Sequence, residues 1–136
     1  MKILTIEDDI DTTSMYRIVL QQMGDVVSTS LGREGVAIVA VKKPDVVILD
    51  LGLPDQSGLE TLREIRKIDY NVPVLVVTAH TNTDEMVEAL NAGASDFVVK
   101  PFQIRELKAR INARVRYAQH ISAKKDIIKI LEIQNG

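Results

Sequence analysis

Short apolar runs alternate with stretches of helical periodicity along the chain. Five runs of β-branched and aliphatic residues, each followed by polar or turn residues, predict strands at residues 3–6, 26–27, 46–49, 73–77 and 97–99. Apolar residues at helical spacing predict helices over about 11–23 and 32–42, from 57, over 84–90 and from 104. Parallel strands need crossover connections, so this alternation predicts a single doubly wound α/β domain, with a parallel sheet and helices on both faces.

The same spacing predicts which side chains of each helix face the sheet. We expect these to be Met15, Ile18, Val19 and Met23; Val36, Ala37 and Ala40; Leu59, Leu62 and Ile65; Met86, Val87 and Leu90; and Leu107, Ile111 and Val115. Ser57 and Glu60 have the spacing of a capping box at the start of the third helix.

One stretch, residues 45–58, combines a strand with a chemical group. Residues 46–49 are all apolar, as in a strand buried on both faces, and they are followed by Asp50 and a loop containing Gly52, Pro54 and Gly58. Sites in open α/β sheets lie just beyond the carboxyl ends of strands. An Asp that merely opens a turn explains this stretch alone equally well.

Composition narrows the choice of chemistry. The 136 residues carry a net charge of −2, which gives no overall bias toward nucleic acid or anionic membranes. There is no cysteine, which excludes disulfides, thiolate metal sites and a cysteine nucleophile. No signal-peptide pattern and no apolar run of the roughly 20 residues needed to span a bilayer is present, so we expect a cytoplasmic protein without a membrane partner.

Polar groups stand at the ends of four predicted strands. Glu7 and Asp8 follow the first, Asp50 the third, Thr78 ends the fourth, and Lys100 follows the fifth. Parallel strands bring their carboxyl ends to one edge, so three carboxylates would repel one another unless a cation neutralises them. Oxygen ligands alone suit Mg²⁺. A carboxylate can attack phosphorus, while a hydroxyl, an ammonium and a metal stabilise the transferred group, so the cluster predicts phosphoryl chemistry.

In its strand-end residues, the chain resembles the receiver domain of bacterial two-component response regulators. The resemblance covers residues 2–118 and is carried by Glu7-Asp8, Asp50 with Pro54 and Gly58, Thr78-Ala79 and Lys100-Pro101-Phe102. It implies a five-stranded flavodoxin-like sheet with strand order 2-1-3-4-5.

The resemblance also assigns roles to the strand-end residues. Asp50 would accept a phosphoryl group from a sensor histidine kinase or a phosphotransfer protein. Glu7, Asp8, Asp50 and the backbone carbonyl of Gly52 would hold Mg²⁺. Thr78 and Lys100 would bind the phosphoryl group.

Two further positions complete the implied switch. Phe97 occupies the position of an aromatic residue that turns inward when Thr78 moves, although it replaces the commoner Tyr and has no hydroxyl. The Lys100–Pro101 peptide bond is expected to be cis.

The function that follows is a phosphorylation-activated switch that catalyses only its own phosphorylation and dephosphorylation and is otherwise not an enzyme. The fourth helix, fifth strand and fifth helix would carry the response to an output or partner. Asp96, Glu106, Arg110 and Arg116 match the charge pairs of a homodimer through this face, but Met86 and Ser95 depart from the pattern. DNA binding would need an output domain that residues 1–136 do not include.

Two other interpretations of the sequence have less support. A receiver-like interaction module that works without phosphorylation would generally lack one of the acidic pair, the Asp or the Lys, and none is missing here. A flavin-binding or dehalogenase-like domain has less support, because the loop after the first strand is acidic and no second Asp follows Asp50 closely. We interpret Asp9 as a loop carboxylate and Asp55 as a turn residue, and expect His80 to influence phosphoryl lifetime.

Residues 119–136 lie outside the resemblance. They are a linker, a helical extension or the start of a truncated output domain. Five aliphatics among residues 126–133 fit a helix or a strand equally well.

Overall fold

The computed structural model, which describes residues 1–80 and 82–135, has one five-stranded sheet. All neighbouring strands are parallel, and their order is β2-β1-β3-β4-β5, as the resemblance implied. The strands are β1 (Lys2–Ile6), β2 (Asp25–Thr29), β3 (Val46–Leu49), β4 (Val74–Thr78) and β5 (Asp96–Val99). The helices between and after them are α1 (Ile10–Leu20), α2 (Gly32–Lys42), α3 (Gly58–Ile68), α4 (Thr83–Asn91) and α5 (Ile104–Asn135).

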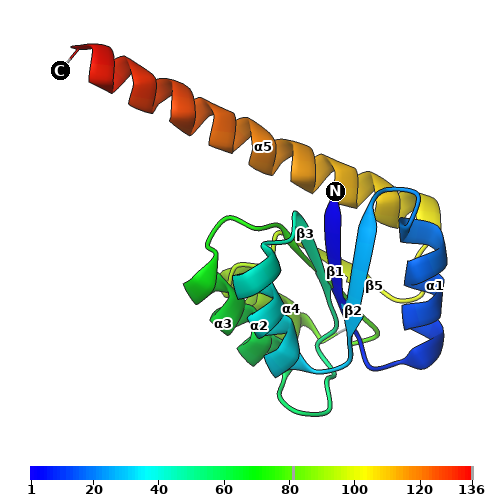
Figure 1. The fold of residues 1–136 in the computed structure, drawn as a ribbon. Helices are drawn as coiled ribbons and strands as arrows, with labels where there is room; N and C mark the ends of the chain where they lie inside the picture. The colour runs from blue at the N-terminus through cyan, green and yellow to red at the C-terminus, as the bar shows by residue number, and fades with distance from the viewer. Residues whose placement is uncertain (81, 136) are drawn as a thin grey trace.

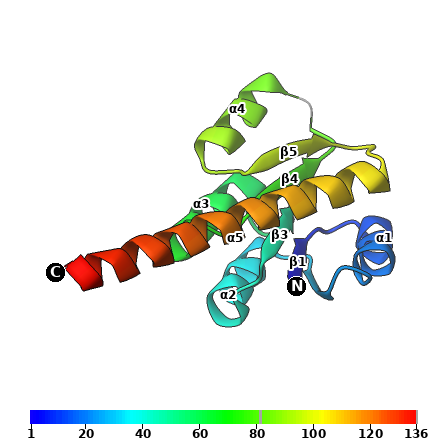
Figure 2. The same ribbon diagram turned by 90° about the horizontal axis from the view of Figure 1, so that it is seen from above.

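Helices cover both faces of the sheet, with α1 and α5 on one side and α2, α3 and α4 on the other (Figure 1). Each side has its own apolar core. Figure 2, seen from above, shows α5 crossing the domain over the side of the sheet that α1 also covers. Because successive strand residues point to opposite faces, the all-apolar run of β3 contributes Val47 and Leu49 to one core and Val46 and Ile48 to the other.

The predicted inward faces of three helices were partly wrong. Ile18 is 66% exposed, and Tyr16 and Leu20 are the buried residues of α1. Val87 and Leu90 of α4 are also exposed.

Close approach to the sheet explains the error in α2. Ala37 and Ala40 are exposed, and Gly32, Gly35 and Val39 face inward. A Cβ on Gly35 would lie only 2.3 Å from Cδ1 of the buried Ile6, so a side chain at this position would require Ile6 to shift. The helix therefore packs Gly35 against Ile6 of β1 and Gly32 against Thr61 of α3, while Ala37 and Ala40 face solvent.

Side chains satisfy unpaired backbone amides at the starts of α1, α2, α3 and α4, and Asn82 caps α4 by accepting from the Asp84 amide at 2.8 Å. Asp9 is the N-cap of α1 and accepts from the Thr12 amide at 3.0 Å, so it is more than a loop carboxylate. Ser57 caps α3 and accepts from the Glu60 amide at 3.1 Å, which is the serine half of the predicted capping box; the hydrogen bonds of the described residues do not include the return bond from the Glu60 side chain.

Asp55 caps a helix that is distant in sequence, which goes beyond its predicted role as a turn residue. Its carboxylate accepts from the amides of Gly32 at 2.8 Å and Arg33 at 3.0 Å, at the start of α2. These bonds hold the loop that follows Asp50 against a neighbouring helix.

The chain after residue 118 continues α5 as a helix to Asn135, which decides between the helical and extended alternatives for this segment. Its C-terminal half projects beyond the sheet (Figure 1). Five aliphatic side chains there are at least 49% exposed: Ile127, Ile128, Ile130, Leu131 and Ile133. Even so, no helix in the described part of the chain combines the length and apolar composition needed to cross a membrane.

Two isoleucines of α5 distinguish the core part of this helix from its extension. Ile111 is 0% exposed and Ile128 is 49% exposed. We expect Ile111→Ala to lower the free energy of unfolding by about 2–5 kcal/mol, because it leaves a cavity. Ile128→Ala, the matched control, should change it by no more than about 0.5 kcal/mol. Urea denaturation followed by circular dichroism measures both, and equal losses would contradict this division of α5.

Candidate functional site

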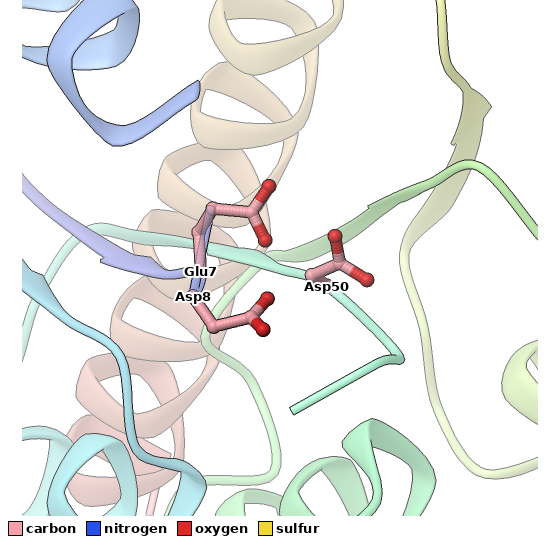
Figure 3. Close-up of side chains that lie close together, drawn as sticks. All are labelled: Glu7, Asp8 and Asp50. Atoms are coloured by element: carbon pink, nitrogen blue, oxygen red, sulfur yellow. The ribbon is translucent and has the colours of Figure 1, made fainter. Parts of the chain in front are cut away.

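The carboxyl ends of β1, β3, β4 and β5 meet at one edge of the sheet. Backbone hydrogen bonds position the residues there: the amide of Asp50 donates to the carbonyl of Ile6 at 3.0 Å, and the amide of Lys100 donates to the carbonyl of Thr78 at 2.9 Å. Figure 3 shows the carboxylates of Glu7, Asp8 and Asp50 gathered at this edge. The structure therefore brings together the strand-end residues that the sequence singled out.

Asp50 is the centre of a hydrogen-bond network. Lys100 Nζ donates to its Oδ2 at 2.8 Å and also donates to Oε1 of Glu7. The Thr78 hydroxyl donates to Asp50 Oδ1 at 3.2 Å, and the Gly52 amide donates to the same oxygen at 2.8 Å. The Lys100 ammonium thus bridges two carboxylates, and both oxygens of Asp50 are held.

The Lys100–Pro101 peptide bond, which follows β5, is cis, the isomer that the resemblance implied. Lys100 is the residue immediately before that proline.

Burial and hydrogen bonding give the two bridged carboxyl groups opposite pKa shifts. Burial, reinforced by a hydrogen bond with Asp50, raises the pKa of Glu7 to about 7, although Lys100 acts to lower it. Burial alone would raise the pKa of Asp50, but hydrogen bonds with Glu7, Lys100 and the Gly52 amide outweigh it and lower the pKa overall. Near neutral pH, Asp50 is therefore the ionised carboxylate, and Glu7 keeps a proton for part of the time.

Three acidic residues fit a hard divalent cation. Glu7, Asp8 and Asp50 each offer a carboxylate oxygen, and these atoms lie within 4.8 Å of one another. Glu7 Oε2 is buried and has no hydrogen-bond partner among the described residues, which is costly unless something binds it. The donor set consists of oxygen alone, as Mg²⁺ prefers.

The surface formed by α4, β5 and α5 carries a charge cluster of its own. Asp96 accepts from Arg110 Nη1 at 3.1 Å and lies 3.7 Å from Nε of Arg114, and Arg110 also pairs with Glu106 at 3.1 Å. Three of the four residues proposed from sequence as a dimer face are therefore paired within one chain. Arg114 joins this cluster within the chain, and the predicted dimer role of Arg116 stays a prediction.

Phe97, the predicted switch residue, is half-buried in β5 and packs against the core under α2, α3 and α4. It pairs with Val76 of β4, two residues before Thr78. Thr78 and Phe97 therefore lie on neighbouring strands, as a coupled movement of the two would require.

Sequence reasoning missed one residue near this site. Glu85, in the first turn of α4, lies 3.4 Å from Nδ1 of His80 through its Oε2 atom. Acidic residues are common in first turns because they complement the helix dipole, so the sequence held no signal for this contact.

Comparisons with known proteins agree with this geometry. The sequence profile of the response regulator receiver domain matches residues 3–112. The chain is 36% identical to the cell cycle transcriptional regulator CtrA of Caulobacter vibrioides, over 97% of this chain and 59% of that protein. It is 40% identical to the virulence transcriptional regulatory protein PhoP of Salmonella choleraesuis, over 85% of this chain and 52% of that protein. The chain therefore spans little more than half the length of these two relatives.

A solved structure shows the same fold. The receiver domain of a sensor histidine kinase from Pseudomonas aeruginosa PAO1, with a magnesium ion coordinated in its active site cleft, has a TM-score of 0.78 and 26% identity. The match covers 84% of this chain and 96% of that one.

The raised pKa of Glu7 predicts a pH dependence of stability in EDTA. The folded state keeps a proton up to a pKa of about 7, whereas the unfolded state releases it near 4.5, so this stabilisation is complete below about pH 4.5 and is lost as the pH rises through 7. The loss should amount to about 2–4 kcal/mol. The glutamine side chain of the Glu7→Gln variant cannot ionise, so this variant should lack the pH-dependent loss of stability.

Urea unfolding of both proteins between pH 5 and 8 measures this difference. Glu60→Gln, at an exposed position of α3, controls for removing a carboxylate elsewhere. Equal pH slopes for the wild type and Glu7→Gln would show that Glu7 does not hold the proton.

Proposed function

The chain belongs to the family of response regulator receiver domains, and we propose that Asp50 is its phosphoryl acceptor. One observation carries this assignment. Asp50 is an ionised strand-end carboxylate whose two oxygens are already held by an ammonium at 2.8 Å and a hydroxyl at 3.2 Å. These are the groups that a phosphoryl group on Asp50 would need around it.

The reaction is a transfer from nitrogen to oxygen. An Asp50 carboxylate oxygen attacks the phosphorus of a phosphohistidine on a sensor kinase or phosphotransfer protein, the P–N bond breaks, and the donor imidazole leaves with the electron pair. The Lys100 ammonium and the Thr78 hydroxyl then bind phosphoryl oxygens in place of the carboxylate oxygens. Under this proposal, the protein acts only on its own phosphoryl group.

We assign Mg²⁺ to Glu7, Asp8, Asp50 and the backbone carbonyl of Gly52. The clustered carboxylate oxygens, the unpartnered Glu7 Oε2 and the magnesium ion of the Pseudomonas aeruginosa receiver support this assignment. When bound, the ion would neutralise negative charge on the transferred phosphoryl group. Glu7 and Asp50 must both be ionised to offer their oxygens.

We further propose that the switch runs from Thr78 to Phe97. In this structure the Thr78 hydroxyl donates to Asp50, and Phe97 is half-buried on the adjacent strand. Movement of Thr78 toward a phosphoryl group would favour the inward position of the Phe97 ring and so bias an existing equilibrium of the surface formed by α4, β5 and α5. The ring lacks a hydroxyl, so packing alone would carry the change.

The output is proposed by analogy with the longer relatives. CtrA and PhoP are named as transcriptional regulators, so DNA binding would depend on a domain outside residues 1–136. The candidates for a homodimer face remain Asp96, Glu106, Arg110 and Arg116, now with Arg114 among them.

We place the end of the receiver domain near residue 118 and treat 119–136 as a helical extension that links it to its output. The cytoplasmic location stays a prediction.

Phosphorylation by a small-molecule donor tests the assignment. Incubation with acetyl phosphate and Mg²⁺ should add the mass of one phosphoryl group to the intact protein, and EDTA should suppress the addition. Asp50→Asn should abolish it, because an amide does not attack phosphorus. Asp9→Asn is the matched control: it lies next to the acidic pair, and Asn also caps helices well, so this variant should still be modified.

Intact-mass spectrometry gives the result directly. A wild-type protein that stays unmodified, or an Asp50→Asn variant that is modified to the same extent, would overturn the proposal. The first result would favour a receiver-like interaction module that works without phosphorylation.

A further inference from the structure

A cavity lies at the edge of the sheet opposite to Asp50. Its volume is about 460 Å³, and it is lined by the end of α3, by the loops that precede β4 and β5, and by one side of α5 between residues 114 and 125. All strands of the sheet are parallel, so these loops at the amino ends of β4 and β5 are far from the strand-end carboxylates. The volume falls in the range of about 300–1,000 Å³ that is usual for small-molecule sites.

The charges that line this cavity are all positive. Arg66, Arg114 and Lys125 belong to the lining, and among the residues that the structure describes no Asp or Glu does. This is unlike the chain as a whole, whose net charge is −2. A concave surface with charges of one sign attracts ligands of the opposite sign. The lining therefore favours an anion.

Arg66 is a fixed, partly buried cation of this site. Its guanidinium donates to the carbonyl oxygens of Asp69 at 3.2 Å, Val72 at 2.6 Å and Gly93 at 2.9 Å, and it reaches the Ser95 hydroxyl at 3.4 Å. None of the ion pairs within residues 1–80 and 82–135 includes Arg66. Burial lowers the pKa of Arg66, although Asp69 acts to raise it. Neutral oxygens thus hold the side chain in place and leave its positive charge without a bound anion.

Two further groups of the lining have donors to spare. Nε of Arg114 lies 3.7 Å from Asp96, while its two terminal nitrogens have no partner in the described part of the chain. The Ser95 hydroxyl accepts from Arg66 and from the Val74 amide at 3.1 Å, and it donates to no described residue. Terminal guanidinium nitrogens bind phosphate oxygens in pairs, and a hydroxyl adds a single donor. These donors are suited to a phosphate group.

Aromatic side chains line the same cavity. Two of the chain's three tyrosines are there: Tyr70, in the loop before β4, is 82% exposed, and Tyr117, on α5, is 62% exposed. An exposed ring offers a flat face on which a nucleobase can stack. The amide side chains of Asn71 and Asn91, also in the lining, carry both donors and acceptors that match the edge of a base. The lining thus combines groups for a phosphate with groups for a base.

We propose that this cavity binds a nucleotide, with its phosphate near the three cations and its base against the two tyrosines. The proposal goes beyond phosphoryl transfer at Asp50 and does not depend on it. The lining includes both the part of α5 that packs on the sheet and the start of its extension at Ile121, Ser122 and Lys125. A bound nucleotide would therefore tie the extension to the loops before β4 and β5, and the extension would respond to a second signal.

A hydrated groove without a ligand of its own is the alternative. Arg114 is partly exposed and Lys125 is exposed, so water and small ions can solvate both charges. Such a groove would attract any polyanion and would not distinguish a nucleotide from its phosphate part. The base is therefore the part of the ligand that separates the two interpretations.

Titration of the ¹⁵N-labelled full chain, followed by NMR, tests the proposal. EDTA is present throughout, so that Mg²⁺ does not bring a nucleotide to the carboxylates. The probes are ATP, GTP, CTP and UTP, each alone at up to millimolar concentration. At least one should give saturable amide shifts at Asn71, Gly93 and Ser122, and none at Asp8 or Asp50. The matching nucleoside and tripolyphosphate should each bind at least about tenfold more weakly, because each lacks one half of the contacts.

Variants at two exposed parts of the lining separate the phosphate from the base. Arg114→Gln should raise the Kd by about tenfold through loss of charged hydrogen bonds. Arg116→Gln is its matched control, since Arg116 is on the same helix, exposed and outside the lining; its Kd should equal that of the wild type. Tyr70→Leu should raise the Kd by about fivefold or more, whereas Tyr70→Phe keeps the ring and should bind like the wild type.

The outcomes also separate this inference from the assignment of Asp50. Absence of saturable shifts with all four nucleotides, or shifts at the carboxylate edge alone, would overturn the proposal. Tripolyphosphate that binds as tightly as the nucleotide would identify a groove for polyanions and contradict a nucleotide site. Asp50→Asn should bind the nucleotide like the wild type while it fails to accept a phosphoryl group, so either claim can fail without the other.

Discussion

The Lys100 ammonium lies between the carboxylates of Glu7 and Asp50, and the rest of the site depends on this arrangement. The parallel sheet brings acidic residues from β1 and β3 to one edge, where they would repel one another in a partly buried position. In the strand order, β3 and β4 separate β1 from β5, so Lys100 must reach across the edge to contact Glu7. Its cation offsets this repulsion, and hydrogen bonds with Glu7, Lys100 and the Gly52 amide together lower the pKa of Asp50.

The opposing effects of burial, neighbouring carboxylates and the Lys100 cation also explain why the site can respond to ligands. Glu7 is held near its point of ionisation by burial and by Asp50, so a divalent cation would compete with a proton at this carboxylate. The Thr78 hydroxyl and Lys100 ammonium are engaged by Asp50 in this structure, and a phosphoryl group on Asp50 would offer them new oxygen partners. Both groups would exchange one partner for another, and Thr78 lies on the strand that pairs with β5, which carries Phe97.

Much of the fold and the site follows from the sequence, because strand ends in a parallel sheet must converge. That rule was enough to group Glu7, Asp8, Asp50, Thr78 and Lys100, and alternating strand and helix patterns gave the architecture. The sequence did not predict correctly which side chains of α1, α2 and α4 face the sheet, because these helices carry more apolar residues than one face needs. In α2 the close contact of Gly35 with Ile6 decides the orientation, and glycine has no hydrophobicity to reveal it. The cap that Asp55 provides to α2 and the contact of Glu85 with His80 join residues whose positions only the folded chain relates.

The proposed switch requires that phosphorylation of Asp50 alter a surface on α4, β5 and α5. Backbone amide chemical shifts, compared by NMR before and after phosphorylation, test it most directly, with Asp50→Asn treated in the same way as the reference. We expect shifts at Thr78, at Phe97 and along the exposed faces of α4 and α5, well beyond contact distance of the phosphoryl group. Shifts confined to the immediate neighbours of Asp50 would contradict it.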